Sequence, residues 1–242
     1  MGVRFIERAK AVLSELDHAR DEIRQIQGGL HGRISVCLGL LPHLTLLPRA
    51  LKAFRARYPD VQLDITEGRF PDVESALRSG VVDLFVGPLH SDVGKEFAVE
   101  ELYEQELAVL CRQGHPLAKA RSLRALVHAE WLTNSVTVVP MDEIGPLFAR
   151  HGLPPPRLMV QSHSALTILV SVAYSDLLVL LPSDVARSEL GGPLLHRVPV
   201  REAIPTPAIG MIHRVSLPLT PAAEYFADMI RRASEEFRPR CG

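Results

Sequence analysis

Polar side chains follow an apolar run early in the chain, in the stretch "SVCLGLLPHLT" that ends at Thr45. His43 and Thr45 can each donate a hydrogen bond to a bound anion, and Leu40 and Leu41 can make apolar contact beside them. The alternative is that Thr45 satisfies the start of a helix while His43 faces solvent. These residue types suit polar contacts to a small ligand, and they leave both interpretations open.

A second candidate group is the sequence from Glu67 to Phe70, which follows the next apolar run. Arg69 would supply a counter-charge for an acidic ligand, and Phe70 would stack on a ring. A solvated loop is the competing interpretation for Arg69, because arginine side chains are mostly exposed in proteins.

The second half of the chain has two comparable groups, each directly after an apolar run. Small polar side chains there suit a small ligand, but the same residue types are common in turns. The candidates are Asn134, Ser135 and Thr137 after "EWLT", and Ser162 and His163 before the next helical pattern. Ser164, which follows them, is interpreted as the N-cap of that helix.

Motifs for catalysis or cofactor binding are missing from this sequence. It has no G-x-S-x-G, C-x-x-C, H-E-x-x-H, G-x-G-x-x-G or P-loop pattern, and its 10 histidines show no metal-ligand spacing. Two of the three cysteines, Cys37 and Cys111, stand in apolar runs and are predicted to be buried thiols. We therefore expect neither an enzyme nor a bound metal or cofactor.

The bulk composition is that of an ordinary globular protein. Of the 242 residues, 47% are hydrophobic and 23% are charged, which argues against disorder. The chain has 27 Lys and Arg against 28 Asp and Glu. It therefore lacks the net positive charge that would attract nucleic acid or an anionic membrane. The scattered cysteines favour a reducing compartment, and the charged N-terminus resembles neither a signal peptide nor a membrane span. A cytoplasmic location is therefore expected.

The elements that must position the candidate residues alternate between strands and helices from residue 34 onward. Residues 34–38 and the stretches "YPDVQLDI" and "VVDLFVG" are apolar runs separated by helical patterns. A second set follows, with one strand over residues 100–111, a helix over 164–174, the run "LLVLLP" and a final helix capped by Thr220. This alternation predicts an α/β fold with mostly parallel sheets, and the two blocks predict two lobes.

The first 27 residues form a separate helical pattern. Apolar residues recur there at three- and four-residue steps and give one wide stripe that needs a partner. Its most regular positions are Ile6, Leu13, Leu16 and Ile23. The stripe predicts pairing with a second copy, although a lone chain can instead fold the helix back on its own core. Gly28 and Gly29 then end the helix and open a linker.

In this order, the motifs resemble the linker helix and effector-binding domain of LysR-type transcriptional regulators. The resemblance is carried by "LLPRALKAFRARYPDVQLDITEGRFPDVESALRSGVVDLFVG", "LYEQELAVLCRQGHPLA", "WLTNS" and "LPLTPAAEYFADMIRRA", and it covers roughly residues 3 to 237. The stretches "YSDLL" and "LPLTPAA" resemble a subgroup with a member that responds to toluenesulfonate, an aromatic anion. By contrast, residues 174–176 stand where the family usually has a glycine-rich turn.

The family fold consists of two Rossmann-like lobes with a ligand cleft between them, the type 2 periplasmic binding protein fold, preceded by an amphipathic linker helix. The resemblance implies a linker and dimerisation helix over residues 1–29, a first lobe over 30–112 plus 206–238, and a second lobe over 113–205. Ligands of open α/β sheets lie beyond the carboxyl ends of the strands. The stretch "LLPHLT", with Leu41, Pro42, His43 and Thr45, would therefore form one wall of the site and favour a carboxylate or sulfonate.

The resemblance further implies an effector-sensing and oligomerisation domain of a DNA-binding regulator. A homodimer or homotetramer is implied, and DNA would be bound only through a helix-turn-helix that belongs to a longer parent protein. The alternative is a periplasmic-type receptor for a small anion. The charged N-terminus and the apolar stripe of the first helix both argue against that alternative.

Overall fold

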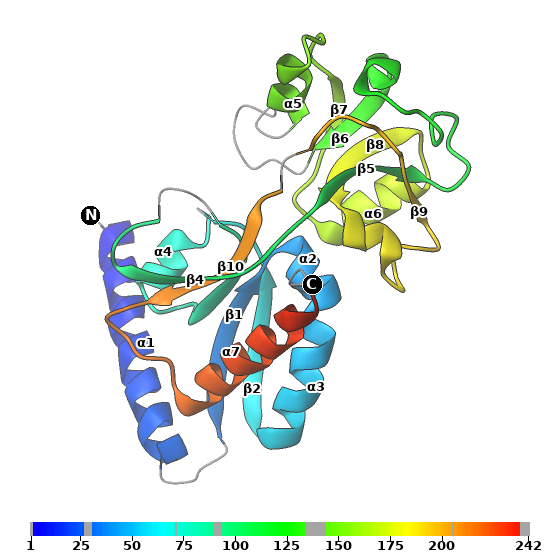
Figure 1. Cartoon of the computed structure of the whole chain (residues 1–242). Helices are drawn as coiled ribbons and strands as arrows, with labels where there is room; N and C mark the ends of the chain where they lie inside the picture. The colour runs from blue at the N-terminus through cyan, green and yellow to red at the C-terminus, as the bar shows by residue number, and fades with distance from the viewer. Residues whose placement is uncertain are drawn as a thin grey trace. The chain divides into compact units, whose positions relative to one another are not determined.

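The computed structural model describes residues 2–26, 31–70, 72–89, 93–133, 144–204 and 206–237, and the chain divides into two compact units. Unit 1 comprises Met1–Glu104 and Ala208–Gly242, and unit 2 comprises Gln105–Pro207. The chain therefore crosses between the units twice. Each unit contains a five-stranded sheet accompanied by helices (Figure 1), so the predicted α/β fold with two lobes is confirmed. The sheets are mixed rather than mostly parallel as predicted, because each contains two antiparallel strand pairs beside two parallel ones.

The sheet of unit 1 has the strand order β2-β1-β3-β10-β4. β1 (Gly32–Leu38) is parallel to β2 (Val61–Glu67) and to β3 (Leu84–Pro88). β10 (Ala208–Arg214) is antiparallel to both of its neighbours, β3 and β4 (Phe97–Glu104). The central strand β3 reads LFVGP and is almost entirely buried, as is typical of a strand that is covered on both faces.

Helices supply the apolar cover of this sheet. They are α2 (Leu40–Thr45), α3 (Leu47–Arg57), α4 (Glu74–Arg78), α7 (Pro221–Ser234) and the short 3-10 turn η3 (Glu235–Phe237). α3 and α7 lie side by side (Figure 1), and the rings of Phe54 and Phe226 meet edge to face at 5.6 Å between centroids. α7 starts as predicted, because the Thr220 hydroxyl accepts a hydrogen bond from the Ala223 amide at 3.3 Å.

The first helix, α1 (Gly2–Ile26), belongs to unit 1 and packs against α7 and β1. Among its described side chains, Asp21 and the buried Gln25 form hydrogen bonds to the rest of unit 1. Within the part of the chain that is described, none of the helices is both long and apolar enough to span a membrane.

The sheet of unit 2 has the strand order β7-β6-β8-β5-β9. Its strands are β5 (Leu107–Arg112), β6 (Glu130–Thr133), β7 (Arg157–Gln161), β8 (Leu177–Pro182) and β9 (Leu195–Arg197). Its helices are α5 (Ile144–Arg150), α6 (Ala165–Ala173) and the 3-10 turns η1 (Leu123–Leu126) and η2 (Ser183–Arg187). β6 is parallel to β7 and β8, and the core is centred on Trp131, whose ring meets Phe148 edge to face at 5.6 Å.

The helix start that the sequence predicts at Ser164 is confirmed. Ser164 caps α6 by accepting a hydrogen bond from the Thr167 amide, and α6 ends at Ala173. Gly80 and Gly152, which follow α4 and α5, have φ angles of 73° and 63°. These left-handed conformations explain why glycine stands at both helix ends.

The single strand predicted over residues 100–111 is wrong. It consists of β4 in unit 1 and β5 in unit 2, separated by Gln105 and Glu106, and the Gln105 amide donates to the Pro207 carbonyl at 2.9 Å. The units therefore divide after Glu104 and after Pro207, whereas the resemblance implied divisions after residues 112 and 205. Apolar residues occur both in β4 and in β5, because both strands are partly or fully buried. The sequence pattern therefore does not indicate that the chain passes from one sheet to the other between them.

The core of unit 2 gives a direct test of the packing. Leu178 is fully buried in β8, and its replacement in Leu178→Ala should lower the free energy of unfolding by about 2–5 kcal/mol through lost contacts and a cavity. Leu190 in the same unit is 66% exposed, and Leu190→Ala should change that free energy by less than about 0.5 kcal/mol. Urea unfolding followed by circular dichroism measures both. Equal effects of the two substitutions would contradict the assigned core.

Candidate functional site

In unit 1, β1 and β2 end at one level beside β3, which brings the segments that follow β1 and β2 together. In the register, Leu38 of β1 lies opposite both Glu67 of β2 and Val86 of β3. Beyond the strand ends, the Gly39 amide donates to the Val86 carbonyl at 2.8 Å, and the Gly68 amide donates to the Leu38 carbonyl at 3.1 Å. The start of α2 and the turn at Gly68 are therefore fixed side by side at the carboxyl edge of the sheet.

The close fit at this edge explains its glycines. A Cβ atom on Gly39 would lie 3.3 Å from Pro88 Cδ, and a Cβ atom on Gly68 would lie 2.7 Å from Cys37 Sγ. The second distance is shorter than side chains tolerate, so Gly68 has to remain glycine unless the thiol moves.

The stretch "LLPHLT" forms the short helix α2 itself, rather than a turn that leads into a helix. Leu41 and Pro42 are the buried residues of α2, and Leu41 is only 2% exposed. They therefore anchor the helix in the core of unit 1. The hydroxyl of Thr45 donates to the Leu41 carbonyl at 3.0 Å. Since its proton is used within the helix, the Thr45 hydroxyl can accept a hydrogen bond from a ligand, but it does not donate one to an anion.

His43 is half-buried, and its hydrogen bonding defines its tautomer. Nδ1 lies 3.1 Å from the Gly39 carbonyl oxygen, and because that oxygen only accepts, Nδ1 carries the proton. The other ring nitrogen, Nε2, is then an acceptor in the neutral ring and a donor in the protonated ring. His43 can therefore donate from Nε2 to an anion when it is charged.

The structure separates the two candidates that follow β2. Phe70 is 3% exposed, and its ring packs against Phe85 and Phe97 at centroid distances of 6.2 and 6.1 Å. These neighbours occupy the ring, so Phe70 supports the turn from the core and does not offer a face to a ligand as the sequence suggested. Arg69 is half-buried on the turn itself, and its carbonyl accepts from the Val73 amide at 3.1 Å.

In unit 2, the carboxyl ends of β6 and β7 are joined in the same way. The Ser162 amide donates to the carbonyl of Thr133, a buried residue, at 3.0 Å. The Ser162 hydroxyl accepts from the Ser164 amide at 3.3 Å, and His163 between them is exposed. Ser162 and His163 therefore lie directly before the start of α6. The other candidates of this unit, Asn134, Ser135 and Thr137, lie outside the described residues.

A buried histidine that sequence reasoning missed holds the turn over residues 174–176. His115 Nδ1 accepts from the Leu117 amide at 3.0 Å, so Nε2 carries the proton and donates to the Asp176 carbonyl at 3.1 Å. Arg112 Nε also donates to the Asp176 carboxylate, at 2.8 Å, and the Ser175 hydroxyl donates to the Ser171 carbonyl at 2.6 Å. This polar clamp fixes a turn at which the family usually has glycines. The stretch "RQGHP" contains the arginine and histidine, but nothing in it indicates their distant partner.

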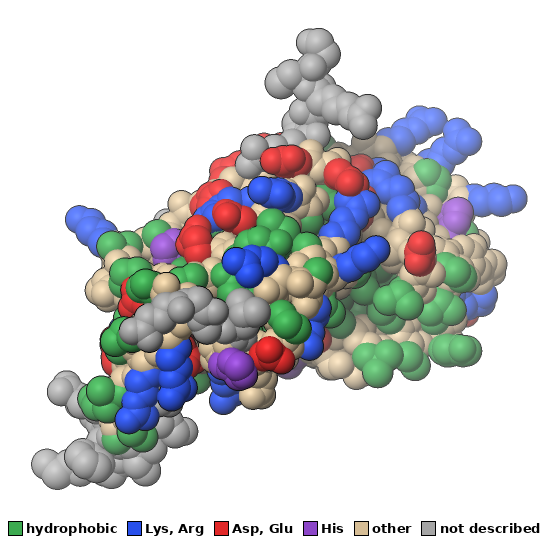
Figure 2. Space-filling model, turned by 90° about the horizontal axis from the view of Figure 1, so that it is seen from below, with side chains coloured by type: hydrophobic (Ala, Val, Ile, Leu, Met, Phe, Trp, Pro, Cys, Tyr) green, Lys and Arg blue, Asp and Glu red, His purple; other side chains and the backbone are tan. Residues whose placement is uncertain are grey.

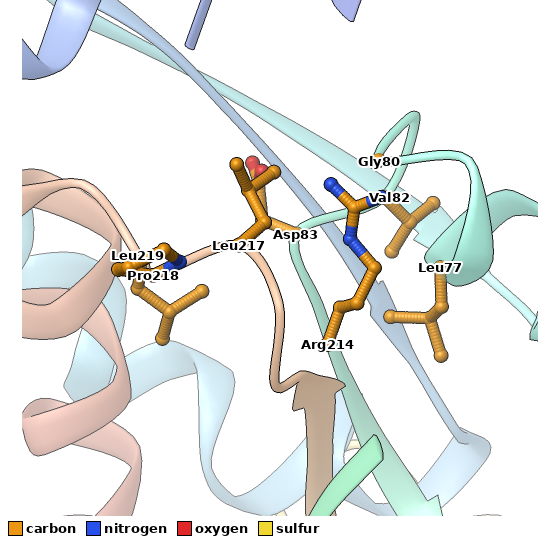
Figure 3. Close-up of a pocket in the computed structure, with 8 residues that line it drawn as sticks. All are labelled: Leu77, Gly80, Val82, Asp83, Arg214, Leu217, Pro218 and Leu219. Carbon is orange, nitrogen blue, oxygen red and sulfur yellow. The ribbon is translucent and has the colours of Figure 1, made fainter. Parts of the chain in front are cut away.

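The chain has a small pocket at the opposite edge of the unit 1 sheet, with an open volume of about 210 Å³ (Figure 3). It is lined by residues at the start of β3 and the end of β10, which include Asp83 and Arg214. None of the ligand candidates proposed from the sequence lines it. The pocket is therefore separate from the turns at the carboxyl edge.

Several charged side chains on the surface are paired with one another. On the face shown in Figure 2, acidic and basic side chains lie close together among hydrophobic ones. Arg231, for example, contacts the carboxylates of Glu100, Glu224 and Asp228 within 3.0 Å. Such local pairing agrees with the near-zero net charge.

Metal and thiol chemistry find no support in the described residues. Among them, no group of three His, Cys, Asp or Glu side chains is arranged to hold a metal ion. Cys37 and Cys111 are both buried and unpaired, as predicted. Burial raises the pKa of the Cys37 thiol and raises that of Cys111 to about 11, so both stay protonated near neutral pH.

Two exposed apolar stripes stand out on the surface. On α1, Leu13, Leu16 and Ile23 are 61%, 56% and 58% exposed, whereas the side chain of Ile6 is outside the described part. On α6, Leu166, Val170 and Tyr174 follow one another at four-residue steps, and all are exposed. The α1 stripe was visible in the sequence. The α6 stripe was not, because an apolar helix of nine residues looks the same whether it is buried on one side or on both.

Comparisons with known proteins agree on one family. The sequence profile described as "LysR substrate binding domain" matches residues 27–235. The HTH-type transcriptional regulator GbpR of Azospirillum brasilense is 27% identical over 237 residues, which cover 96% of this chain and 69% of that protein. The HTH-type transcriptional regulator GalR of Pseudomonas putida is 28% identical over 229 residues, which cover 94% of this chain and 58% of that protein. The chain thus spans well under three quarters of either relative.

Solved structures show the same fold. The effector binding domain of QuiR in complex with shikimate has a TM-score of 0.68 at 18% identity, over 86% of this chain and 100% of that chain. The effector binding domain of BenM with its effector benzoate has a TM-score of 0.64 at 21% identity, over 86% and 96%. Full-length CbnR complexed with its target DNA has a TM-score of 0.71 at 19% identity, over 97% and 82%.

The raised thiol pKa values lead to a test by alkylation. In a Cys241→Ser variant, iodoacetamide at pH 8 should leave Cys37 and Cys111 unmodified, because burial keeps both thiols protonated and inaccessible. Both should react once urea unfolds the protein, and mass spectrometry counts the added groups. Rapid modification of either cysteine in the folded protein would contradict the assigned burial.

Proposed function

The chain belongs to the LysR substrate-binding domain family, and we propose that it senses a small organic anion on behalf of a DNA-binding transcriptional regulator. The observation that carries the proposal is the combination of this family match, which spans both units, with polar residues on turns beyond the carboxyl ends of parallel strands. Ligands of open α/β sheets bind at such ends. DNA binding would be a property of the whole regulator that carries this chain.

The chemistry of the turns supports an anionic effector. Three basic side chains, His43, Arg69 and His163, stand at the carboxyl ends of the two sheets, and Ser162 adds a hydroxyl beside His163. Hydrogen bonds from charged donors to a carboxylate or sulfonate are about twice as strong as neutral ones. Leu41, Pro42 and Phe70 would hold the turns in place from the core, and Thr45 would accept a hydrogen bond from a ligand hydroxyl.

An aromatic carboxylate or sulfonate is the effector class that we favour. The sequence resembles that of a toluenesulfonate-responsive subgroup, and two structures of this fold hold benzoate and shikimate, which are both ring carboxylates. Asn134, Ser135 and Thr137 remain candidates for contacts to the ring substituents.

Two other functions are less well supported. A periplasmic-type solute receptor would share the fold, but the relatives reported above are named as transcriptional regulators. An enzyme would need a nucleophile, metal or acid-base pair, and the described residues offer buried, protonated thiols in place of reactive ones. We therefore propose a sensor without catalytic activity or a cofactor.

The exposed stripe on α1 supports assembly with a second copy. Asp21 and Gln25 of α1 bond the rest of unit 1, whereas Leu13, Leu16 and Ile23 are exposed, without apolar cover among the described residues. Together with Ile6, these side chains would pair with the same helix of another chain. The stripe on α6 would add a contact between copies in an antiparallel dimer.

A comparison of matched ligands tests the effector class. Benzoate, shikimate and toluenesulfonate should be screened by thermal shift against benzamide, which has the shape of benzoate without its charge. A ligand at a hundred times its dissociation constant stabilises by about 2.7 kcal/mol, which raises the melting temperature by several degrees. We expect a shift with at least one anion and none with benzamide. Equal shifts with benzamide and benzoate would contradict recognition of the charge.

Substitutions then test the turns, one unit at a time. His43→Ala and His163→Ala should each weaken binding of the selected anion about tenfold, because each removes a candidate hydrogen-bonding side chain from its turn. His128→Ala is the matched control, since His128 is exposed in unit 2 and is not part of either turn. Isothermal titration calorimetry gives the affinities. Wild-type affinity in both turn variants would remove these residues from the site.

The apolar stripe is tested by a charge substitution. Leu16→Glu should shift the protein toward the monomer, because a carboxylate in a helix pair would have to lose its water. Val215→Glu serves as the control, since Val215 is also an exposed apolar residue of unit 1 but lies outside α1. Multi-angle light scattering at several concentrations measures the mass. A wild-type monomer, or an unchanged mass for Leu16→Glu, would contradict pairing through α1.

A further inference from the structure

Three described polar side chains of α1 contact the rest of unit 1 at three points along the helix. Glu15 accepts from Arg214 at the end of β10. Asp21 accepts from the Arg33 amide at the start of β1, at 3.0 Å. Gln25 accepts from the Ala222 amide in the first turn of α7, at 2.9 Å. The described apolar side chains of the helix mostly face away from unit 1.

Gln25 is the most buried of these groups, with 7% of its surface exposed. The first amides of a helix have no partner within the helix. Thr220 caps the Ala223 amide, and Gln25 supplies an acceptor for the Ala222 amide next to it. Gln25 Nε2 also donates to the His31 carbonyl at 3.4 Å. α1 therefore completes the N-terminal cap of α7 from outside that helix.

The backbone at Gly32 lies close to the α1 side chains of Asp21 and Gln25. The φ angle of Gly32 is 141°, and a Cβ atom there would lie 2.8 Å from both Asp21 Oδ2 and Gln25 Nε2. A glycine at this position lets two of the three contacts form at once. This fit indicates one defined position of α1 on the rest of unit 1, which we call its seat.

Arg214 provides the third contact and lines the pocket of Figure 3. Its guanidinium extends toward Gly80 and Val82 in that view, and NH1 donates to the Arg78 carbonyl at 3.0 Å. NH2 bonds Glu15, while Nε is buried without a hydrogen-bond partner among the described residues. Arg214 is thus held in place from unit 1, and Glu15 is the group that α1 adds to it.

We propose that the seat of α1 is a reversible polar latch, in which Glu15, Asp21 and Gln25 engage and release together. Among the described side chains, the contact consists of a few hydrogen bonds and one partly exposed ion pair. Such a contact is weak compared with a packed apolar face, so release is accessible without unfolding unit 1. In the engaged state, the described side chains of the apolar stripe of α1 point away from the rest of unit 1. Release of the helix from unit 1 therefore breaks no contact of these side chains. A pair of α1 helices could therefore stay together while unit 1 changes its position on them.

The latch has two reporters within unit 1. The Arg33 and Ala222 amides donate to α1 side chains, on Asp21 and Gln25, so both lose their acceptors when the helix leaves. In Glu15→Gln, which alters neither acceptor, we expect hydrogen exchange of both amides to accelerate by about fivefold, because the loss of one contact raises the population of the released helix. Glu22→Gln is the matched control on the same helix, at a residue for which the structure describes no ion pair.

Hydrogen exchange followed by NMR separates the outcomes. Equal acceleration of both reporters, with buried amides of β1 and β3 unchanged, supports the latch. Unchanged reporters would show that the three contacts act independently, and this would overturn the proposal. Equal acceleration of the reporters and the buried strand amides would also overturn it, because the seat would then open only with the whole unit. The test uses no effector, so its result is independent of the proposed sensing function.

Discussion

Two backbone hydrogen bonds fix the ends of β1 and β2 beside β3 in unit 1. The Gly39 amide bonds the Val86 carbonyl, and the Gly68 amide bonds the Leu38 carbonyl. Because parallel strands point the same way, this alignment places the turns after β1 and β2 side by side, together with His43 and Arg69. The small glycines at both turns follow from the same constraint, since larger residues would collide with Pro88 or Cys37.

Unit 2 achieves a comparable arrangement with different means. The bond from the Ser162 amide to the Thr133 carbonyl aligns β6 and β7, and Ser164 then begins α6. The nearby turn at Asp176 is fixed by Arg112 and His115 rather than by glycines. In unit 2, side-chain hydrogen bonds thus fix the turn that precedes β8.

The alternation of apolar runs predicted the α/β fold and two lobes, and the caps at Ser164 and Thr220 were readable because capping is local. The division of residues 100–111 between two sheets was not readable, since a buried strand looks the same in either sheet. The sequence also did not predict which way the candidate side chains point. Phe70 and Leu41 proved to be core residues, and the Thr45 hydroxyl is used within its own helix, because these outcomes depend on distant neighbours.

We propose that a small anion binds at the turns beyond the carboxyl ends of the strands. Amide chemical-shift mapping with the anion that stabilises the protein best would test it most directly. We predict the largest changes at Gly39, His43, Gly68 and Arg69 in unit 1 and at Ser162 and His163 in unit 2. Changes concentrated instead at Asp83 and Arg214, which line the pocket at the opposite edge of the unit 1 sheet, would contradict the account.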